Sequence, residues 1–464
     1  MPAEGSDGAI DLSRPRAVHI VGIGGAGMSA IAIVLVSMGH RVTGSDLKEG
    51  RALARLRLVG VDARVGHGAE HVTDDVDAVV VSTAIPASNP EVVEANRRGV
   101  PVLRRAEALR ALVATRRGIA VAGSHGKTTT SSMLALVLRA AGWKPSFVIG
   151  GELNEVGTNA AYDDGEWFVV EADESDGTFL ELAPEAAIVT NVEPDHIDHY
   201  GSFEQLERAF EEFLTGLTGP RVVGIDDPVA ASLAARVGGV VTYGWAEDAH
   251  YRVTGYEGRR DGSRFDLEHA GAVVGTIELP VPGRHNASNA VAATALALEI
   301  GVPFAAAAEA LRGFGGVARR FQFRGEVDGV TIVDDYAHLP GEVAAMIRAA
   351  REGDWPRVVV VFQPHRYSRT ARLWRDFADA FRDADALVLT DVYPAGEAPR
   401  PGVSGRLVLR AVLDAHPSLP VAYLPRRAEV VAHALRWARP GDLLLTLGAG
   451  DLTTVSDEWL AATR

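Results

Sequence analysis

Short apolar runs alternate with longer helix-like stretches along most of the chain. The first run, at residues 17–23, ends in glycines and precedes an apolar stretch that predicts a helix from about 26 to 38. Further strand-like runs follow at 41–44, 77–82 and 100–103, and helical stretches separate them. This rhythm is typical of a parallel sheet that carries helices on its faces.

The middle of the chain begins a second unit of the same kind. The apolar run 118–122 leads through a glycine-rich turn into a predicted helix at 127–141. The pattern then predicts strands at 166–171 and 186–190, a β-rich stretch at 240–282, and helices at about 286–300 and 303–312. The segments around 112–118 and 313–320 are the candidate linkers between units.

The last part of the chain repeats the α/β rhythm a third time. Its predicted strands lie at 330–335, 357–363, 385–390 and 441–447. Polar residues gather where these strands end, and open α/β sheets bind ligands at the carboxyl ends of their strands. We therefore expect three α/β units with candidate site residues at the strand ends.

Composition narrows the class of protein. The chain has 464 residues, of which 47% are hydrophobic and 23% charged, as in an ordinary folded protein. Its formal net charge is −15, which argues against nucleic acid or an anionic membrane as a partner. The absence of cysteine excludes disulfides and thiolate chemistry. The polar, acidic first residues do not resemble a secretory signal, so we expect a cytoplasmic protein.

Lysine is rare in this chain. Only Lys48, Lys127 and Lys144 are found among the 46 basic residues, and all the others are arginines. Arginine is a planar fork and lysine is a compact point charge, so the two are not interchangeable at a tight site. A lysine in a sequence with this bias is therefore a candidate for a role that arginine cannot fill.

A glycine motif follows the first predicted strand. Gly22, Gly24 and Gly27 form G-x-G-x-x-G before the first helix, and Asp46 lies where a ribose-binding acid is expected. Glycines there allow backbone amides to approach a diphosphate at a helix N-terminus. The motif favours NAD or another nucleotide diphosphate, and a tight turn without a ligand is the alternative.

The segment 123–130, GSHGKTTT, carries the strongest signal. It lies between a predicted strand and a predicted helix, where backbone amides and the helix dipole suit a polyphosphate. Lys127 suits the β- and γ-phosphates, and Thr128 suits Mg²⁺. The loop is two residues shorter than a strict Walker A motif, which would need glycine where Val121 stands.

Two acidic clusters follow later strands. The first, 171–176, is EADESD, and its usual outcome is a solvated acidic loop. The second, 193–199, is EPDHIDH, whose carboxylates and imidazoles could hold Mg²⁺ or Mn²⁺ near phosphates. Two such clusters behind a phosphate loop favour a metal site.

Other candidates lie in the last third of the chain. Asn286 could cap a helix or contact a purine edge, and Arg320 could be ordinary surface charge. His365, Arg366 and Arg369 lie at a strand end, where an arginine fork could bind a carboxylate.

Together these motifs make the sequence resemble the Mur ligase family over nearly its whole length. The resemblance rests on GIGGAGMSA (22–30), GSHGKTTT (123–130), EADESDGTFL (171–180), TNVEPDHIDHY (190–200), GRHNASNAVAA (283–293), FGGVARRFQ (314–322), DDYAH (334–338) and FQPHRYSRT (362–370). It implies an α/β protein of three domains: a Rossmann-like UDP-substrate-binding domain at 1–115, a P-loop-type ATP-binding domain at 116–316, and a Rossmann-like C-terminal domain at 317–464.

The resemblance also implies a reaction. ATP would phosphorylate the carboxylate of UDP-N-acetylmuramate, and the amine of L-alanine would attack the acyl phosphate to form an amide in peptidoglycan precursor synthesis. Mg²⁺, or Mn²⁺ in its place, would be the metal cofactor, and the protein would be a monomer or a weak homodimer.

Residue roles follow from motif positions. For ATP the resemblance implies Gly123, Ser124, His125, Gly126, Lys127, Thr128 and Thr129, with Asn286 at adenine, Arg320 at phosphate and Asp335 at ribose. For the metal it implies Thr128, Glu171 and His196. For UDP it implies Gly22, Gly24, Gly25, Gly27, Asp46, Ser82 and Thr83, and for the two carboxylates Tyr336, His338, His365, Arg366 and Arg369. The candidate catalytic residues are Lys127, Glu171, His196 and His338.

Three other functions compete with this interpretation. An NAD-dependent dehydrogenase would use the 22–27 loop but leaves 123–130 unexplained. A related ligase that attaches a recycled tripeptide to the same sugar nucleotide usually carries bulkier residues in the first glycine loop. A nucleotide-binding switch without ligase activity would hydrolyse ATP slowly without an acceptor.

Overall fold

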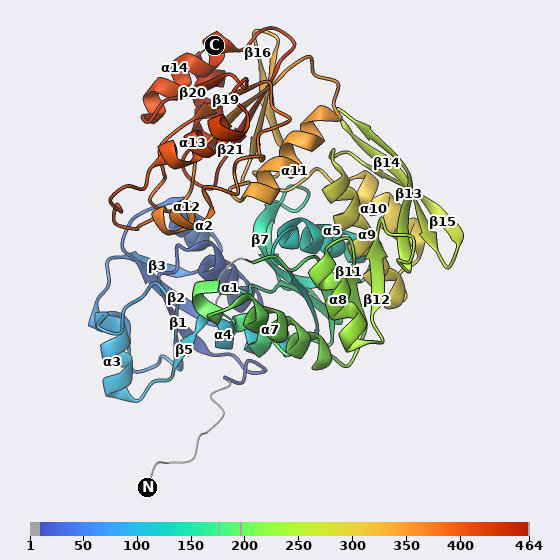
Figure 1. The fold of residues 1–464 in the computed structure, drawn as a ribbon. Helices are drawn as coiled ribbons and strands as arrows, with labels where there is room; N and C mark the ends of the chain where they lie inside the picture. Colours follow the sequence, from blue (N-terminus) through green and yellow to red (C-terminus); the bar gives the residue numbers. More distant parts are fainter. Residues whose placement is uncertain (1–9, 176, 195–196, 463–464) are drawn as a thin grey trace. The chain divides into compact units, whose positions relative to one another are not determined.

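The computed structural model describes residues 10–175, 177–194 and 197–462, whose strands form three sheets. Figure 1 shows the order of the elements along the chain. By packing, the chain divides into two compact units. The first runs to residue 253 and includes 267–275 and 288–311, and the second holds 254–266, 276–287 and 312–464. The predicted boundaries at 115/116 and 316/317 remain predictions.

The first sheet is parallel and has the strand order β3-β2-β1-β4-β5. Its strands are β1 (Ala17–Val21), β2 (Arg41–Asp46), β3 (Asp62–Val65), β4 (Ala78–Val81) and β5 (Val102–Arg104). Its helices are α1 (Ala26–Ser37), α2 (Arg51–Leu58), η1 (Ala69–His71), α3 (Pro90–Arg98) and α4 (Arg105–Val113). Successive side chains of a strand point to opposite faces. Val18 and Ile20 accordingly join the core around α1, whereas Val21 packs with Ala95 of α3 on the other face.

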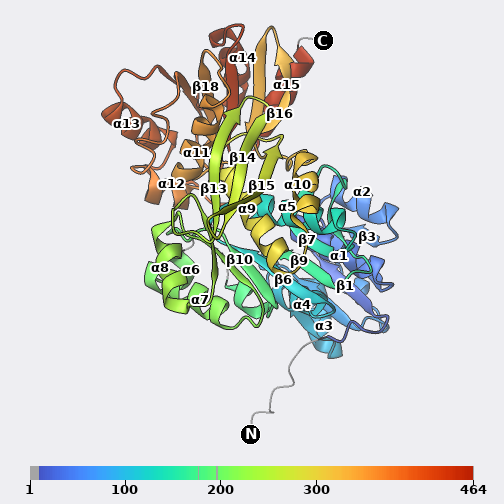
Figure 2. The same ribbon diagram turned by 90° about the vertical axis from the view of Figure 1, so that its right-hand side faces the viewer.

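The second sheet has ten strands in the order β15-β14-β13-β12-β11-β10-β6-β9-β7-β8. They are β6 (Arg117–Ala122), β7 (Ser146–Leu153), β8 (Thr158–Ala161), β9 (Trp167–Glu171), β10 (Ala186–Val189), β11 (Arg221–Gly224), β12 (Val241–Gly244), β13 (Tyr251–Arg259), β14 (Gly262–His269) and β15 (Ala272–Leu279). Figure 2 shows the long strands β13, β14 and β15 side by side. β6 runs parallel between β10 and β9, so the carboxyl ends of these three strands lie at the same edge.

Helices of this middle region follow the strands. They are α5 (Lys127–Ala140), η2 (Thr178–Glu181), α6 (Ile197–Tyr200), α7 (Phe203–Thr215), α8 (Pro228–Val237), α9 (Arg284–Glu299) and α10 (Phe304–Arg312). α5 packs against β6, β7 and β9, and this contact fixes its first turn above the end of β6.

The third sheet has the order β16-β17-β21-β18-β19-β20, with β16 antiparallel to β17. Its strands are β16 (Gln322–Val327), β17 (Val330–Asp335), β18 (Val358–Phe362), β19 (Ala386–Leu389), β20 (Val421–Tyr423) and β21 (Leu443–Leu447). Its helices are α11 (Pro340–Arg351), α12 (Tyr367–Leu373), α13 (Gly405–Ala415), α14 (Arg427–Trp437) and α15 (Thr453–Ala462). Alternate residues of β18 face α11 and α13 on one side and α14 and α15 on the other, which explains the unbroken apolar run in this strand.

Most predicted strands and helices are present, close to the expected bounds. Strands that the hydrophobic pattern did not predict are short or mixed with polar residues: β3, β7, β8, β11, β16 and β20. Among the described residues, no helix combines the length and the apolar character that a membrane crossing requires.

Candidate active site

The loop between β6 and α5 is shaped by two glycines. Gly123 and Gly126 have φ angles of 127° and 82°, in the left-handed region that favours glycine. A Cβ on Gly126 would lie 2.5 Å from Asn289 Oδ1, and one on Gly123 would lie 2.1 Å from Thr190 Oγ1. Gly126 is the N-cap residue of α5, and as a glycine it has no side chain to cap the first turn. Uncapped amides at a helix N-terminus suit an anion such as a phosphate.

The end of β10 holds this loop in place. The amide of Ser124 donates to the carbonyl of Asn191 (3.1 Å), and the amide of His125 donates to Asn191 Oδ1 (2.8 Å). Thr190 Oγ1 donates to the carbonyl of His125 (2.6 Å). The loop conformation is therefore fixed by neighbouring residues before any ligand binds.

Lys127, the predicted phosphate-binding lysine, is held in a buried ion pair. Its Nζ donates to the carbonyl of Gly123 (2.6 Å) and to both carboxylate oxygens of Glu174 (2.9 and 2.7 Å). The Lys127 side chain is 14% exposed and that of Glu174 is 2% exposed. Burial alone would lower the pKa of Lys127, but the carboxylates of Glu174 and Asp173 outweigh burial and raise it. The ammonium is therefore charged at neutral pH and aimed at the loop.

Glu174 shows that the solvated-loop expectation for 171–176 is wrong for this residue. Glu174 as a whole residue is only 1% exposed to solvent. Its backbone carbonyl accepts a hydrogen bond from Tyr200 Oη (2.6 Å). Burial alone would raise the pKa of Asp173, but the charge of Lys127 outweighs burial and lowers it. Glu174 and Asp173 thus act as counter-charges of Lys127, and sequence alone gave no sign of this pairing.

Thr128 and Glu171, two predicted metal ligands, lie together. Thr128 Oγ1 donates to Glu171 Oε1 (3.1 Å), and the amide of Gly150 donates to Glu171 Oε2 (2.7 Å). A hydroxyl and a carboxylate are hard oxygen donors of the kind that Mg²⁺ prefers. These residues therefore fit a magnesium site. The third predicted ligand, His196, lies outside the described residues, as does Asp195.

The second acidic cluster contacts the phosphate loop through Glu193. Its side chain lies 3.1 Å from His125 Nε2, and its amide donates to Ser124 Oγ (2.8 Å). Ser124 and His125, both predicted to contact ATP, are thus held by the segment that follows β10. Thr129 lies in the buried first turn of α5.

The glycine loop of the first sheet lies at the end of its central strand. Gly22 has a φ of 76°, and its amide and that of Ile23 donate to the carbonyl of Ser45 (2.8 and 3.0 Å). The amide of Gly24 donates to Asp46 Oδ2 (2.9 Å). The structure therefore brings Asp46 to the loop. Its carboxylate accepts a hydrogen bond from the amide of Gly24, a residue predicted to bind UDP.

Ser82 and Thr83 follow β4, the neighbour of β1 on the side opposite β2. A Cβ on Gly22 would lie 3.8 Å from Ser82 Oγ, so Ser82 lies beside the loop. Thr83 is exposed. Gly25 directly precedes α1, and Gly27 lies in its first turn, where a Cβ would be 3.2 Å from Arg105 Nη1. These residues lie at the carboxyl ends of β1, β2 and β4, beside the point where strand order reverses, which is the usual ligand position in such sheets.

The predicted carboxylate-binding residues cluster at the ends of β17 and β18. The rings of Tyr336 and His338 lie 5.5 Å apart, and those of His338 and His365 lie 5.6 Å apart. Arg369 Nη1 lies 3.3 Å from His365 Nδ1. Arg366 has a φ of 68°, a left-handed backbone that costs about 1–3 kcal/mol in a non-glycine residue. The five residues therefore lie in one group, and their role in carboxylate binding remains a prediction.

The histidines of this group are neutral at pH 7. Burial lowers the pKa of His338. Burial lowers the pKa of His365 to about 4, and the neighbouring His338 and Arg369 add to this effect. Positive charge in the group therefore comes from Arg366 and Arg369, which suits the binding of a carboxylate.

Asp335 and Asn286, predicted to contact ribose and adenine, are buried and hydrogen-bonded to the backbone. Asp335 is 2% exposed, and its oxygens accept hydrogen bonds from the amides of Phe321 (2.6 Å) and Ala337 (2.7 Å). Burial raises the pKa of Asp335 to about 6. Asn286 is 6% exposed, and its Nδ2 donates to the carbonyl of Pro282 (2.7 Å). In this structure both side chains anchor the backbone, and their nucleotide contacts remain predictions.

Arg320, the predicted phosphate contact, packs over an aromatic ring. Its guanidinium lies 5.3 Å from the centroid of Tyr336, and Arg319 lies 4.8 Å from the same centroid. Arg319 also donates to the carbonyl of Gly448 (2.7 Å). Both arginines therefore lie over the ring of Tyr336, and Arg319 is in addition tied to the backbone.

Models of one protein family match three consecutive parts of the chain. The Mur ligase family, catalytic domain, matches residues 17–117; the Mur ligase middle domain matches 121–297; and the Mur ligase, glutamate ligase domain, matches 319–450.

Curated relatives match over nearly full length. A UDP-N-acetylmuramate--L-alanine ligase of Anaeromyxobacter sp. (strain Fw109-5) is 48% identical over 97% of this chain and 98% of the relative. Another protein of that name, from Pelotomaculum thermopropionicum, is 46% identical over 96% of this chain and 97% of the relative.

Solved structures show the same architecture. A UDP-N-acetylmuramate-alanine ligase of Thermotoga maritima superimposes with a TM-score of 0.82 at 31% identity, covering 96% of this chain and 98% of that one. A murein peptide ligase of Psychrobacter arcticus 273-4 gives a TM-score of 0.69 at 25% identity, covering 97% of this chain and 98% of that one.

Proposed function

This chain belongs to the Mur ligase family, and we propose that it is an ATP-dependent ligase that joins L-alanine to UDP-N-acetylmuramate in peptidoglycan synthesis. The observation that carries the chemistry is the loop 123–126 together with the charged and largely buried Lys127 that follows it. The choice of substrates rests on the relatives of that name, which match this chain from end to end at nearly half identity.

The reaction proceeds through an acyl phosphate. A carboxylate oxygen of UDP-N-acetylmuramate attacks the γ-phosphorus of ATP, and ADP leaves. The amine of L-alanine then attacks the acyl carbon, loses a proton, and expels inorganic phosphate. Charge accumulates on the phosphoryl oxygens during transfer, so the Lys127 ammonium and the amides at the start of α5 stabilise the transition state.

Thr128 and Glu171 are the proposed metal-binding pair, with His196 as a further candidate. Mg²⁺ bound there, or Mn²⁺ in its place, would neutralise phosphate charge. The contact between Thr128 and Glu171 supports this role, because it places two oxygen donors together at the first turn of α5.

The remaining site residues have proposed substrate roles. UDP binds at the strand ends that carry Gly22, Gly24, Gly25, Gly27, Asp46, Ser82 and Thr83. The carboxylates of alanine and the muramyl group are held by Tyr336, His338, His365, Arg366 and Arg369. Asn286, Arg320 and Asp335 serve the adenine, phosphate and ribose of ATP. The monomeric or weakly dimeric state and the cytoplasmic location also stay predictions.

The recycling ligase is the less favoured candidate. The murein peptide ligase structure matches at 25% identity, well below the curated alanine-adding relatives. A dehydrogenase is not supported, because the family models cover the second and third parts of the chain as well as the first.

ADP release by the purified protein tests the proposal. With Mg²⁺, ATP and UDP-N-acetylmuramate, we expect ADP to form on addition of L-alanine, faster than with glycine or L-serine. Equal ADP release without the sugar nucleotide would contradict the ligase assignment. Faster turnover with a tripeptide than with L-alanine would favour the recycling ligase instead.

A further inference from the structure

A buried group of histidines surrounds one glutamate on the α3 side of the first sheet. His19 lies in the middle of β1, on the same face as Val21, and pairs in register with Thr43 of β2. Glu91 lies in the first turn of α3, and His71 ends η1, which packs against α3. His19 is 1% exposed and Glu91 is 0% exposed. The proposed reaction uses none of these three residues.

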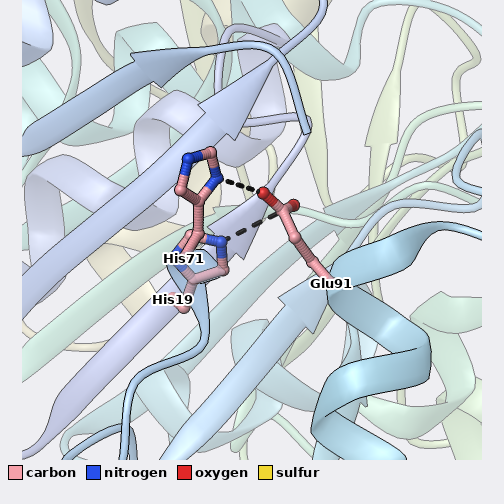
Figure 3. Close-up of side chains that lie close together, drawn as sticks. All are labelled: His19, His71 and Glu91. Carbon is pink, nitrogen blue, oxygen red and sulfur yellow. Dashed lines mark hydrogen bonds and ion pairs between the residues drawn. The ribbon is translucent and has the colours of Figure 1, made fainter. Parts of the chain in front are cut away.

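The three side chains converge on one point, as Figure 3 shows. His71 Nδ1 lies 2.6 Å from Glu91 Oε1, and His19 Nε2 lies 3.6 Å from Glu91 Oε2. One nitrogen from each histidine and one carboxylate oxygen all lie within 4.8 Å of one another. Two imidazoles and a carboxylate are a frequent ligand set for zinc and other first-row transition metals.

The unsatisfied ring nitrogen of His19 is a second, independent indication that an ion binds between these side chains. Its Nδ1 is 2.8 Å from Thr43 Oγ1, whereas its buried Nε2 has no hydrogen-bond partner among the residues that the structure describes. The atom that Nε2 faces is a carboxylate oxygen beyond hydrogen-bond distance. Leaving a buried polar nitrogen without a partner is costly, and a cation between the nitrogen and the carboxylate would satisfy both.

Neighbouring polar side chains hold the proposed ligands in position, as the residues around a metal centre commonly do. Thr43 holds the other ring nitrogen of His19, and Ser45 Oγ donates to Glu91 Oε2 (2.6 Å). His71 Nε2 lies 4.0 Å from the exposed carboxylate of Glu70. A metal-binding histidine usually directs its second nitrogen to such a partner. His71 is 12% exposed in its side chain, so the group is not sealed from solvent.

We infer that His19, His71 and Glu91 bind one divalent transition-metal ion of the zinc type, separate from the proposed magnesium site. Metal binding releases to solvent the proton that lies between His71 Nδ1 and Glu91 Oε1, and these two atoms must move apart to admit the ion. His67 is a candidate fourth ligand: its Nδ1 lies 3.3 Å from Glu91 Oε2 and would exchange its contact with Ser45 Oγ (2.8 Å) for the ion.

The site is coupled to the glycine loop through Ser45. The side chain of Ser45 donates to Glu91, and its carbonyl accepts the amides of Gly22 and Ile23. A bound ion would therefore rigidify the ends of β1 and β2. This role is structural and holds whether or not the proposed ligase activity is correct.

Metal uptake by tag-free, chelator-treated full-length protein tests the inference. Calorimetric titration with Zn²⁺, in millimolar Mg²⁺ that fills hard-oxygen sites, should show one tight equivalent, and Co²⁺ should give the visible absorption of a nitrogen- and oxygen-ligated ion. His71→Asn and Glu91→Gln should weaken Zn²⁺ binding by about 100-fold, since loss of even an outer-shell partner costs about 10- to 100-fold. His416→Asn is the matched control, because His416 also contacts a carboxylate, that of Asp379 (2.8 Å), and should leave uptake unchanged.

Two results would overturn the inference. One is the absence of a tight equivalent in the wild-type protein. The other is equal uptake by the wild-type protein and a folded His71→Asn variant. If Glu91→Gln fails to fold, as judged by circular dichroism, the His71 variant and X-ray absorption of the Co²⁺ complex decide, because the latter reports histidine ligands directly.

Discussion

Lys127 is the residue on which the proposed chemistry depends. Its ammonium lies within 2.6–2.9 Å of three oxygens in a pocket where its side chain is only 14% exposed. A guanidinium is larger and planar and cannot place one point charge among these oxygens. The rarity of lysine in the sequence predicted a special role for this residue before its contacts were known.

Lys127→Arg should leave the fold intact and reduce turnover by about 100-fold or more, in the range seen when a transition-state charge partner is lost. The measurement is kcat for ADP release with UDP-N-acetylmuramate and L-alanine. Lys144→Arg is the control, because Lys144 is exposed, and it should retain full activity. Retained activity in Lys127→Arg would show that the lysine is not specifically required.

Glu174 is the counter-charge that sequence analysis could not identify. Because it lies 47 residues from Lys127, only the parallel arrangement of β6 and β9 brings the pair together. Glu174→Gln should destabilise the nucleotide-free protein by about 3 kcal/mol, since it leaves a buried ammonium without its partner. Saturating ATP with Mg²⁺ should reduce the difference in Tm between the Glu174→Gln variant and the wild-type protein, because the phosphates supply the negative charge that the variant lacks.

The control for this variant is Glu185→Gln. Glu185 pairs with Arg117 near the surface (2.6 Å), and its loss should cost no more than about 1 kcal/mol. A Glu174→Gln protein as stable as the wild type would show that the buried pair contributes nothing.

His285 makes stability depend on pH. Burial, together with the charges of Arg320 and Arg348, lowers its pKa to about 4 from an ordinary value near 6.5. The unfolded chain therefore binds a proton between pH 6.5 and 4 that the folded chain does not, so stability is lost as pH falls through this window, by up to about 3 kcal/mol. The fall in Tm from pH 7 to pH 5 should be smaller in His285→Asn than in the wild-type protein, and an equal fall would refute this assignment.

At the scale of elements, the strand–loop–helix unit β6–α5 shows how sequence determines a site. The apolar run, the two glycines and the start of α5 at Lys127 were all predicted from the pattern, because each is a local property. The short strands β3 and β20 and the edge strand β16, with sequence QFRGEV, were not predicted. Their pairing depends on neighbouring strands distant in sequence rather than on a strong local pattern.

Gly126→Ala should damage this element. The substitution adds a Cβ 2.5 Å from Asn289 Oδ1 at a positive φ, so the loop must shift and its amides lose their alignment. We expect ATP to bind at least about tenfold more weakly by calorimetry, which corresponds to about 1.4 kcal/mol. Gly142→Ala, at φ 79° with nothing within 4 Å of the added atom, bears the same backbone strain without the clash and should bind ATP normally. Equal affinity of the two variants would contradict the close-packed loop.

At the scale of the whole molecule, three sheets present candidate residues at the carboxyl ends of their strands. That arrangement was predictable, because parallel strands with helical connections leave their loops at one edge. What a bound nucleotide would contact was less predictable: Asp335 and Asn286 match family motifs, yet their polar atoms are engaged with the backbone here.

The histidine and glutamate group on the first sheet was not predicted, since His19, His71 and Glu91 are far apart in sequence. A single histidine within the apolar run of β1 was its only local sign.

The central claim is that a phosphoryl group passes from ATP to the carboxylate of the sugar nucleotide before the amide forms. Isotope transfer tests this most directly: UDP-N-acetylmuramate labelled with ¹⁸O in its carboxylate is turned over with ATP, Mg²⁺ and L-alanine, and the released phosphate is analysed by mass spectrometry. An acyl phosphate leaves one carboxylate oxygen in each phosphate, so we predict one ¹⁸O per phosphate from fully labelled substrate. Unlabelled phosphate, formed together with the amide product, would contradict the account.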